Sequence, residues 1–198
     1  MGELERVRLR DLEELMTAVP ELLDRIREHL SALGRPAAAD LVRPGLSADD
    51  LNQALGDVPD GVRDWFSWCD GTRRRAGQTV GDATFIPGYI FPSVAEARSV
   101  RQLGNSDLDA MGEWVPLLVS ASADIYAAVW RQGAFVGVAG VLMGAETEIE
   151  FLTVEEMLQV QLAAYENGAY CLDGGEFEVD DGLLDEAYRQ VTGREPLE

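Results

Sequence analysis

Three glutamates alternate with other residues at positions 146, 148 and 150. If this segment is a strand, Glu146, Glu148 and Glu150 share one face, because successive side chains of a strand point to opposite faces. Such a row of carboxylates could bind a cation or contact a basic partner. A solvent-exposed strand face is the more common interpretation of the same pattern, so the sequence leaves these alternatives open.

Residue types that commonly act as nucleophiles or metal ligands are few. His29 is the only histidine, which excludes multi-histidine metal sites and most Ser-His-Asp or Cys-His arrangements. Cys69 and Cys171 form no CxxC motif, as is typical of free thiols in a reducing compartment. Asp180 and Asp181 are adjacent, so their side chains point apart and do not suit a shared metal. We therefore expect no enzyme, and no catalytic residue, metal or cofactor.

Acidic residues dominate the chain. Among 198 residues, 36 Asp and Glu oppose 16 basic residues, for a formal net charge of −20. Fifteen of the acids and two of the bases lie in residues 146–198. This charge repels nucleic-acid phosphates and an anionic membrane surface, so we exclude both as partners. The acidic quarter is either a solubilising surface or a docking face for a basic protein, because charge of one sign speeds association with an oppositely charged partner.

No segment reads as a targeting or membrane sequence. The first ten residues, MGELERVRLR, have no apolar core and do not form a signal peptide. The longest uncharged run, residues 132–145, is too short to span a bilayer. Together with the two lone cysteines, this predicts a cytoplasmic protein.

The spacing of apolar residues predicts an α+β protein. Residues 62–69 place four apolar side chains on one helical face, and Gln132-Gly133 between two apolar runs indicates a β-hairpin. We expect a polar loop at 104–109. Consecutive strands between helical regions imply an antiparallel sheet of about four to six strands, with helices packed on one face and N- and C-terminal helices. Helices are predicted over 20–33, 48–55, 62–69, 94–103, 154–166 and 183–191, and strands over 79–80, 84–86, 114–120, 124–131, 134–139, 148–151 and 177–179.

Six short motifs follow one another along the chain. Residues 41–56 contain an Arg-Pro-Gly turn and a helix ending in Leu-Gly, and the next helix ends at Asp70-Gly71. The later motifs are the aromatic and proline-rich segment 85–92, the Trp-Val-Pro sequence within 112–117, the acidic residue and strand of 124–126, and the segment 151–170. In this order the motifs resemble the SUKH superfamily, the fungal cell-wall-assembly-regulator and killer-toxin-resistance family.

The resemblance implies a SUKH-like domain at 41–198, preceded by a helical extension at 1–40. It implies a non-enzymatic domain that binds proteins. In bacteria such domains resemble immunity proteins, which neutralise polymorphic or contact-dependent toxins that are often nucleases. An acidic chain fits a neutraliser of a basic nuclease toxin. A regulatory or scaffold module of the cell-wall assembly or signalling type is the alternative.

We therefore expect a protein partner with a basic surface. A toxin domain is one such partner. Carboxylates of the C-terminal quarter and nearby aromatic side chains would contact it. Trp68 lies off the apolar stripe of its helix, so we expect its ring to be exposed. The partner-binding candidates are Trp68, Asp70, Tyr89, Phe91, Asp124, Tyr126, Glu146, Glu148 and Glu150.

Overall fold

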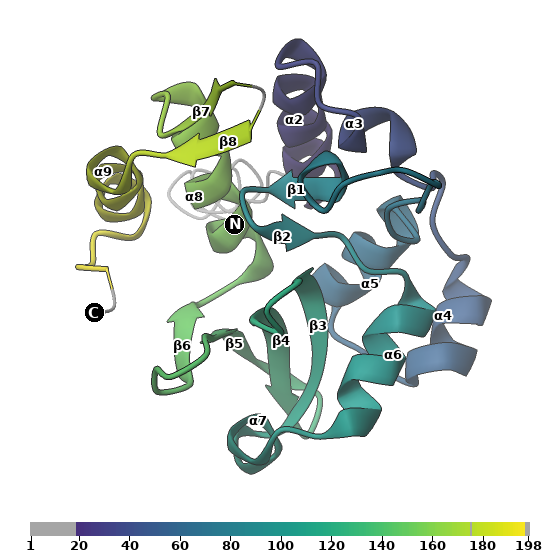
Figure 1. Ribbon diagram of the computed structural model, residues 1–198. Coiled ribbons are helices and arrows are strands. Elements are labelled where there is room, and N and C mark those ends of the chain that lie inside the picture. The colour runs from purple at the N-terminus through teal and green to yellow at the C-terminus, as the bar shows by residue number, and fades with distance from the viewer. Residues whose placement is uncertain (1–18, 175, 197–198) are drawn as a thin grey trace, which may run out of the picture.

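A six-stranded antiparallel sheet runs through the centre of the molecule, with its strands in sequence order (Figure 1). The computed structural model describes residues 19–174 and 176–196. This arrangement confirms the expected α+β class with an antiparallel sheet. The strands are β1 (Thr84–Ile86), β2 (Tyr89–Ile90), β3 (Glu113–Ser120), β4 (Ile125–Arg131), β5 (Ala134–Val141) and β6 (Glu148–Phe151), and a separate two-stranded sheet consists of β7 (Tyr170–Asp173) and β8 (Glu176–Val179).

Several helices begin at the capping residues expected from the sequence. Ser47 accepts a hydrogen bond from the backbone N–H of Asp50, and Ser93 forms a capping box with Glu96. Thr153 caps the long helix that follows β6. The helices are α2 (Val19–Ala32), α3 (Ala37–Asp40), α4 (Ala48–Leu55), α5 (Asp60–Trp68), α6 (Val94–Leu103), α7 (Ser106–Met111), α8 (Val154–Glu166) and α9 (Asp181–Thr192), with a short 3-10 helix, η1, at Gly81–Ala83.

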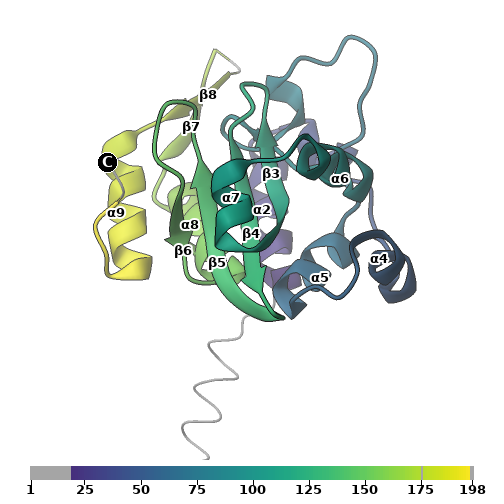
Figure 2. The ribbon, with the colours of Figure 1, turned by 90° about the horizontal axis from the view of Figure 1, so that it is seen from below.

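Helices cover both faces of the sheet. Alternate residues of β4 face opposite ways, because a strand has a period of two. Ala128 and Trp130 belong to the large core with α2, α5 and α8, whereas Ala127 and Val129 belong to a smaller cluster with Leu108 of α7. Figure 2 shows α7 in front of the sheet and α2 behind it. The helices expected on one face do lie there, and α7 adds cover to the other face.

Helix α7 corrects the polar loop expected at 104–109. The Asn105 side chain accepts hydrogen bonds from the backbone N–H groups of Asp107 and Leu108, which is an N-cap. Leu108 is fully buried against the sheet. The helix has only six residues and few apolar side chains, so its periodicity was too weak to be recognised.

The short strand expected at 79–80 is wrong. The side chains of Thr79 and Asp82 each accept a hydrogen bond from the other residue's backbone N–H. These bonds close a turn that leads into η1, so the local polar side chains compete with strand pairing. Strand β7, which pairs with the expected strand β8, was not predicted from the sequence.

Helix α2 packs into the same core as α5 and α8. Leu23, Ile26 and Leu30 are fully buried, and they follow the helical spacing of an apolar stripe. The second part of the expected extension at 1–40 therefore contributes to the main core. Residues 1–18 of that extension lie outside the described residues.

Two glycines of the sequence motifs at 41–56 and 70–71 allow backbones to approach closely. A Cβ at Gly45 would overlap the carbonyl oxygen of Phe66, and one at Gly71 would overlap the backbone nitrogen of Ser93. Gly71 also has a φ of +86°, a backbone conformation that favours glycine. It lies three residues after Trp68, the last residue of α5. These motif glycines thus fix the packing of α5 and the start of α6.

Candidate functional site

A cavity of about 670 Å³ lies between the sheet and the C-terminal elements. Residues from β2, β4, β5 and β6 line one side, and residues from α8, β7 and α9 line the other. Its size is typical of ligand-binding pockets. We call it the acidic cleft, and the residues that define it here are Tyr89, Tyr126, Glu146, Glu148, Glu150 and Asp185.

Glu150 is the half-buried carboxylate of the acidic cleft. The Tyr126 hydroxyl donates a hydrogen bond to it. On the neighbouring strand, Gly140 has no side chain, and a Cβ there would lie 2.6 Å from Glu150 Oε2. Burial raises the pKa of Glu150 to about 7, although the Tyr126 hydrogen bond and the charge of Arg194 oppose this rise. A carboxyl group with such a pKa in a cavity is a candidate for function.

Tyrosines surround Glu150. The rings of Tyr89 and Tyr126 are in contact, with centroids 4.9 Å apart. The Tyr170 hydroxyl donates a hydrogen bond of 2.5 Å to Oε1 of Gln161, a buried residue of α8. Burial raises the pKa of Tyr89 to about 12, and the negative charges of Asp124 and Glu150 act in the same direction. These hydroxyls are therefore neutral donors at physiological pH.

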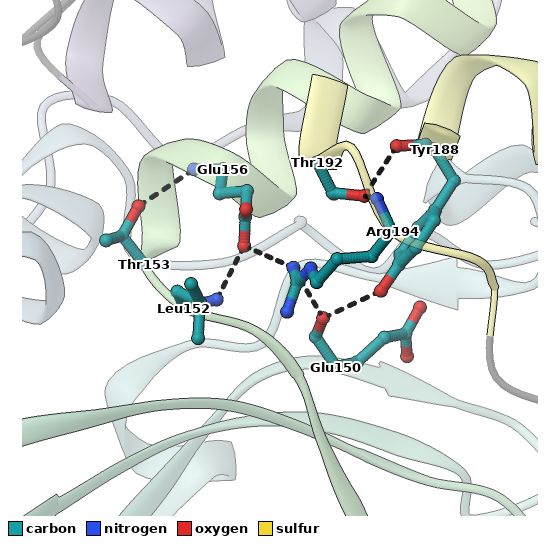
Figure 3. A network of polar contacts seen from close by, with 7 residues as sticks. All are labelled: Glu150, Leu152, Thr153, Glu156, Tyr188, Thr192 and Arg194. Atoms are coloured by element: carbon teal, nitrogen blue, oxygen red, sulfur yellow. Dashed lines mark hydrogen bonds and ion pairs between the residues drawn. The ribbon is translucent and has the colours of Figure 1, made fainter. Parts of the chain in front are cut away.

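The backbone of Glu150 is held separately from its carboxylate (Figure 3). Its carbonyl oxygen accepts hydrogen bonds of 3.1 Å from the Tyr188 hydroxyl and from Arg194 Nη2. Arg194 also forms an ion pair with Glu156 at 2.7 Å, and Glu156 accepts a hydrogen bond from the backbone N–H of Leu152. In Figure 3 the Glu150 side chain extends away from the Arg194 guanidinium. Among the described residues, none forms an ion pair with the Glu150 carboxylate.

Further carboxylates stand around the opening of the cleft. Glu146 and Glu148 are exposed and form no ion pair within the described part of the chain. Asp185 on α9 pairs with Arg189, one helical turn away, at 3.5 Å. The cleft is lined by four acidic residues and, within 19–174 and 176–196, by no arginine or histidine. Its field therefore attracts cations and repels anions.

The structure brings together five of the residues predicted from the sequence. Tyr89, Tyr126, Glu146, Glu148 and Glu150 all line the acidic cleft. The three glutamates are not equivalent, however. Strand β6 begins at Glu148, so Glu146 precedes it, and Glu150 is half-buried whereas the other two are exposed.

The expected exposure of Trp68 is wrong. Its side chain is 5% exposed, and its ring contacts those of Phe85 and Phe91 in the large core. The guanidinium of Arg43 lies over the ring at 4.3 Å. Phe91 is fully buried. Neither Trp68 nor Phe91 lines the cleft, because both rings lie in the large core.

The remaining two candidates, Asp70 and Asp124, stabilise backbone. Asp70 accepts a hydrogen bond from the backbone N–H of Val94 at the start of α6. Asp124 accepts hydrogen bonds from the Ser122 hydroxyl and from the backbone N–H of Met143. The Ser122 hydrogen bond is the main cause that lowers the pKa of Asp124. Asp124 thus anchors the loop between β5 and β6, which carries Glu146.

Sequence reasoning missed Gln161, Tyr170, Tyr188 and Asp185, all of which line the cleft. One signal was present for Gln161. It lies four residues after Met157, on the buried face of α8, where a polar side chain needs a hydrogen-bond partner. No comparable signal was available for Asp185, which is one of many acids in this region.

Comparisons with known proteins do not assign the chain to a family. The chain matches no protein-family model, and no curated protein matches it significantly. Between residues 19 and 196, none of the described helices has the length and apolar character needed to cross a membrane. The same residues contain no group of three or more His, Cys, Asp or Glu side chains arranged to hold a metal ion.

Proposed function

We propose that this protein is a non-enzymatic binding domain whose acidic cleft receives the basic surface of a protein partner. The observation that carries this proposal is the cavity itself, lined by four carboxylates and by tyrosine rings without a basic side chain among the described residues. Interfaces of this kind combine electrostatic steering with aromatic contacts.

The nature of the partner follows from charge. A chain with a net charge of −20 attracts a basic protein and repels nucleic acid. We propose that the partner is a toxin domain, such as a nuclease, and that the protein acts in the cytoplasm as an immunity protein. The order of SUKH-like motifs supports this role. A regulatory or scaffold module would use the same cleft, and a toxin gene beside the gene for this protein would favour immunity.

The test begins with isolation of the partner from the native cell and continues with its binding kinetics. Replacing Glu146, Glu148 and Glu150 together by glutamine should slow association, because these carboxylates create the attractive field of the cleft. Raising salt should slow association of the unmodified protein by roughly tenfold or more, since screening acts on the encounter.

A matched control removes the same charge from other positions. Glu28, Glu178 and Glu186 are exposed and do not line the cleft. Their triple replacement by glutamine should slow association much less than the cleft variant does. Equal effects of the two variants, or an association rate that does not change with salt, would contradict a partner bound at the acidic cleft.

A further inference from the structure

The carboxylate of Glu150 forms no ion pair with any of the residues that the structure describes. We infer that the acidic cleft is a specific site for one cationic side chain, a guanidinium or ammonium group, bound between the Glu150 carboxylate and the rings of Tyr89 and Tyr126. This inference deepens the proposed function, because the cation would be an Arg or Lys side chain of the partner protein.

The first argument is the incomplete pairing of Glu150. Its carboxylate accepts a hydrogen bond from Tyr126, but Arg194, the nearby cation, bonds the Glu150 backbone carbonyl and Glu156 instead. A half-buried carboxylate loses solvation, and it regains favourable interactions either by binding a proton or by pairing with a cation. A cationic ligand would therefore supply the ion pair that the described residues do not give the Glu150 carboxylate.

The second argument is the aromatic wall. Tyr89 and Tyr126 are in ring contact on the sheet side of the cleft, and Tyr126 reaches Glu150 with its hydroxyl. The face of a tyrosine ring attracts cations, and a planar guanidinium also stacks on it. Next to a partly desolvated carboxylate these attractions are stronger than on an open surface.

The third argument is selectivity. Glu146 and Glu148 repel anions at the opening, and within the described residues the lining offers no basic group to bind one. A metal ion is disfavoured because these residues contain no group of three ligands arranged around a centre. The volume of about 670 Å³ accommodates a whole side chain and part of its backbone.

Defined small probes test this site without the partner. We would titrate the protein at about pH 8, where Glu150 is ionised, with N-acetylarginine amide, and follow backbone amide NMR signals. N-acetylcitrulline amide is the control probe, because it has nearly the same shape and no charge. We expect the arginine probe to shift signals of β4, β5 and β6 around the cleft and to bind about tenfold or more tightly than the citrulline probe.

Three variants locate the binding. Glu150→Gln should weaken binding of the arginine probe about tenfold or more, whereas Glu186→Gln, with the same charge change on the outer surface of α9, should weaken it less than about twofold. Gly140→Ala should also weaken it, because the new Cβ would displace the Glu150 carboxylate. Circular dichroism would establish that each variant is folded.

Several results would overturn the inference. These are equal binding of the two probes, undiminished binding by folded Glu150→Gln, or equal losses in Glu150→Gln and Glu186→Gln. The proposed function fails separately. If the arginine probe binds but no basic protein partner does, the site stands and the protein-binding role is wrong. If a basic partner binds at the cleft but the probe does not, the role stands and the single-cation site is wrong.

Discussion

Replacing Glu150 by glutamine should stabilise the protein above neutral pH and leave its stability nearly unchanged in acid. Glutamine is almost isosteric with the protonated carboxyl group, and its side-chain oxygen can still accept the hydrogen bond from Tyr126. The substitution therefore removes the charge of Glu150 while it preserves the packing around the cleft.

The size of the change in the free energy of unfolding follows from the pKa of Glu150, which rises from 4.5 to about 7 on folding. Between these pH values the folded protein holds a proton that the unfolded chain releases, so the free energy of unfolding falls as pH rises. A shift of this size corresponds to roughly 3 kcal/mol above pH 7, at about 1.4 kcal/mol for each pH unit. Below pH 4.5 both states are protonated and the cost disappears.

Urea unfolding at several pH values from about 4 to 8 measures this difference. Glu186→Gln is the control, because it reduces the large negative charge equally at an exposed position that forms no ion pair with any residue between 19 and 196 that the structure describes. We expect Glu150→Gln to gain stability over this control progressively as pH rises. The tyrosines that face Glu150 stay neutral over this range, because burial raises their pKa values further above the ordinary value; they are Tyr89, Tyr126, Tyr170 and Tyr188. A difference between the two variants that does not change with pH would refute the reasoning.

Other predictions concern residues of the large core, of α5 and of the contacts around Glu150. Trp68→Ala should destabilise the protein by about 3–5 kcal/mol in urea unfolding, because it removes a buried ring from an aromatic cluster. Gly45→Ala should cost about 2 kcal/mol or more in the same assay, since its Cβ would overlap backbone of α5. Arg194→Met should cost about 1–2 kcal/mol by loss of hydrogen bonds to Glu150 and Glu156. NMR titration of that variant should also show a higher pKa for Glu150, because the charge of Arg194 lowers it.

Local patterns were sufficient to predict most of the secondary structure. The Gln132-Gly133 turn illustrates this, because both residues have positive φ values, 52° and 79°, as a two-residue hairpin turn of type I′ requires. Such a turn also fixes which strands are neighbours, so the order of β3, β4 and β5 followed from the sequence. The secondary structure was predicted wrongly in short polar segments, where the apolar residues are too few to show a period, as in α7 and at 79–80.

The cleft could be predicted only in part. Alternation placed Glu148 and Glu150 on one face of a strand, but periodicity does not indicate which neighbour lies over that face. Here Tyr170 and Gln161 line the same cleft as Glu150, from elements that follow the sheet in sequence, so the partial burial of Glu150 is a tertiary property. Trp68 shows the opposite limit. Its position off the apolar stripe of α5 suggested that the ring is exposed. In the structure, Phe85 and Phe91, which follow α5 in the sequence, contact the ring.

The partial burial of Glu150 also separates two roles that the acidic residues would otherwise share. Glu148 is exposed at the opening, so its charge acts mainly on the approach of a partner, and Glu148→Gln should lower the association rate. Glu150 would contact the bound cation in a partly desolvated cavity, so Glu150→Gln should mainly raise the dissociation rate. Raising salt should remove most of the first effect and little of the second, because screening is weaker for buried pairs. If both variants change only the association rate, the cleft attracts a partner without binding its side chain at Glu150.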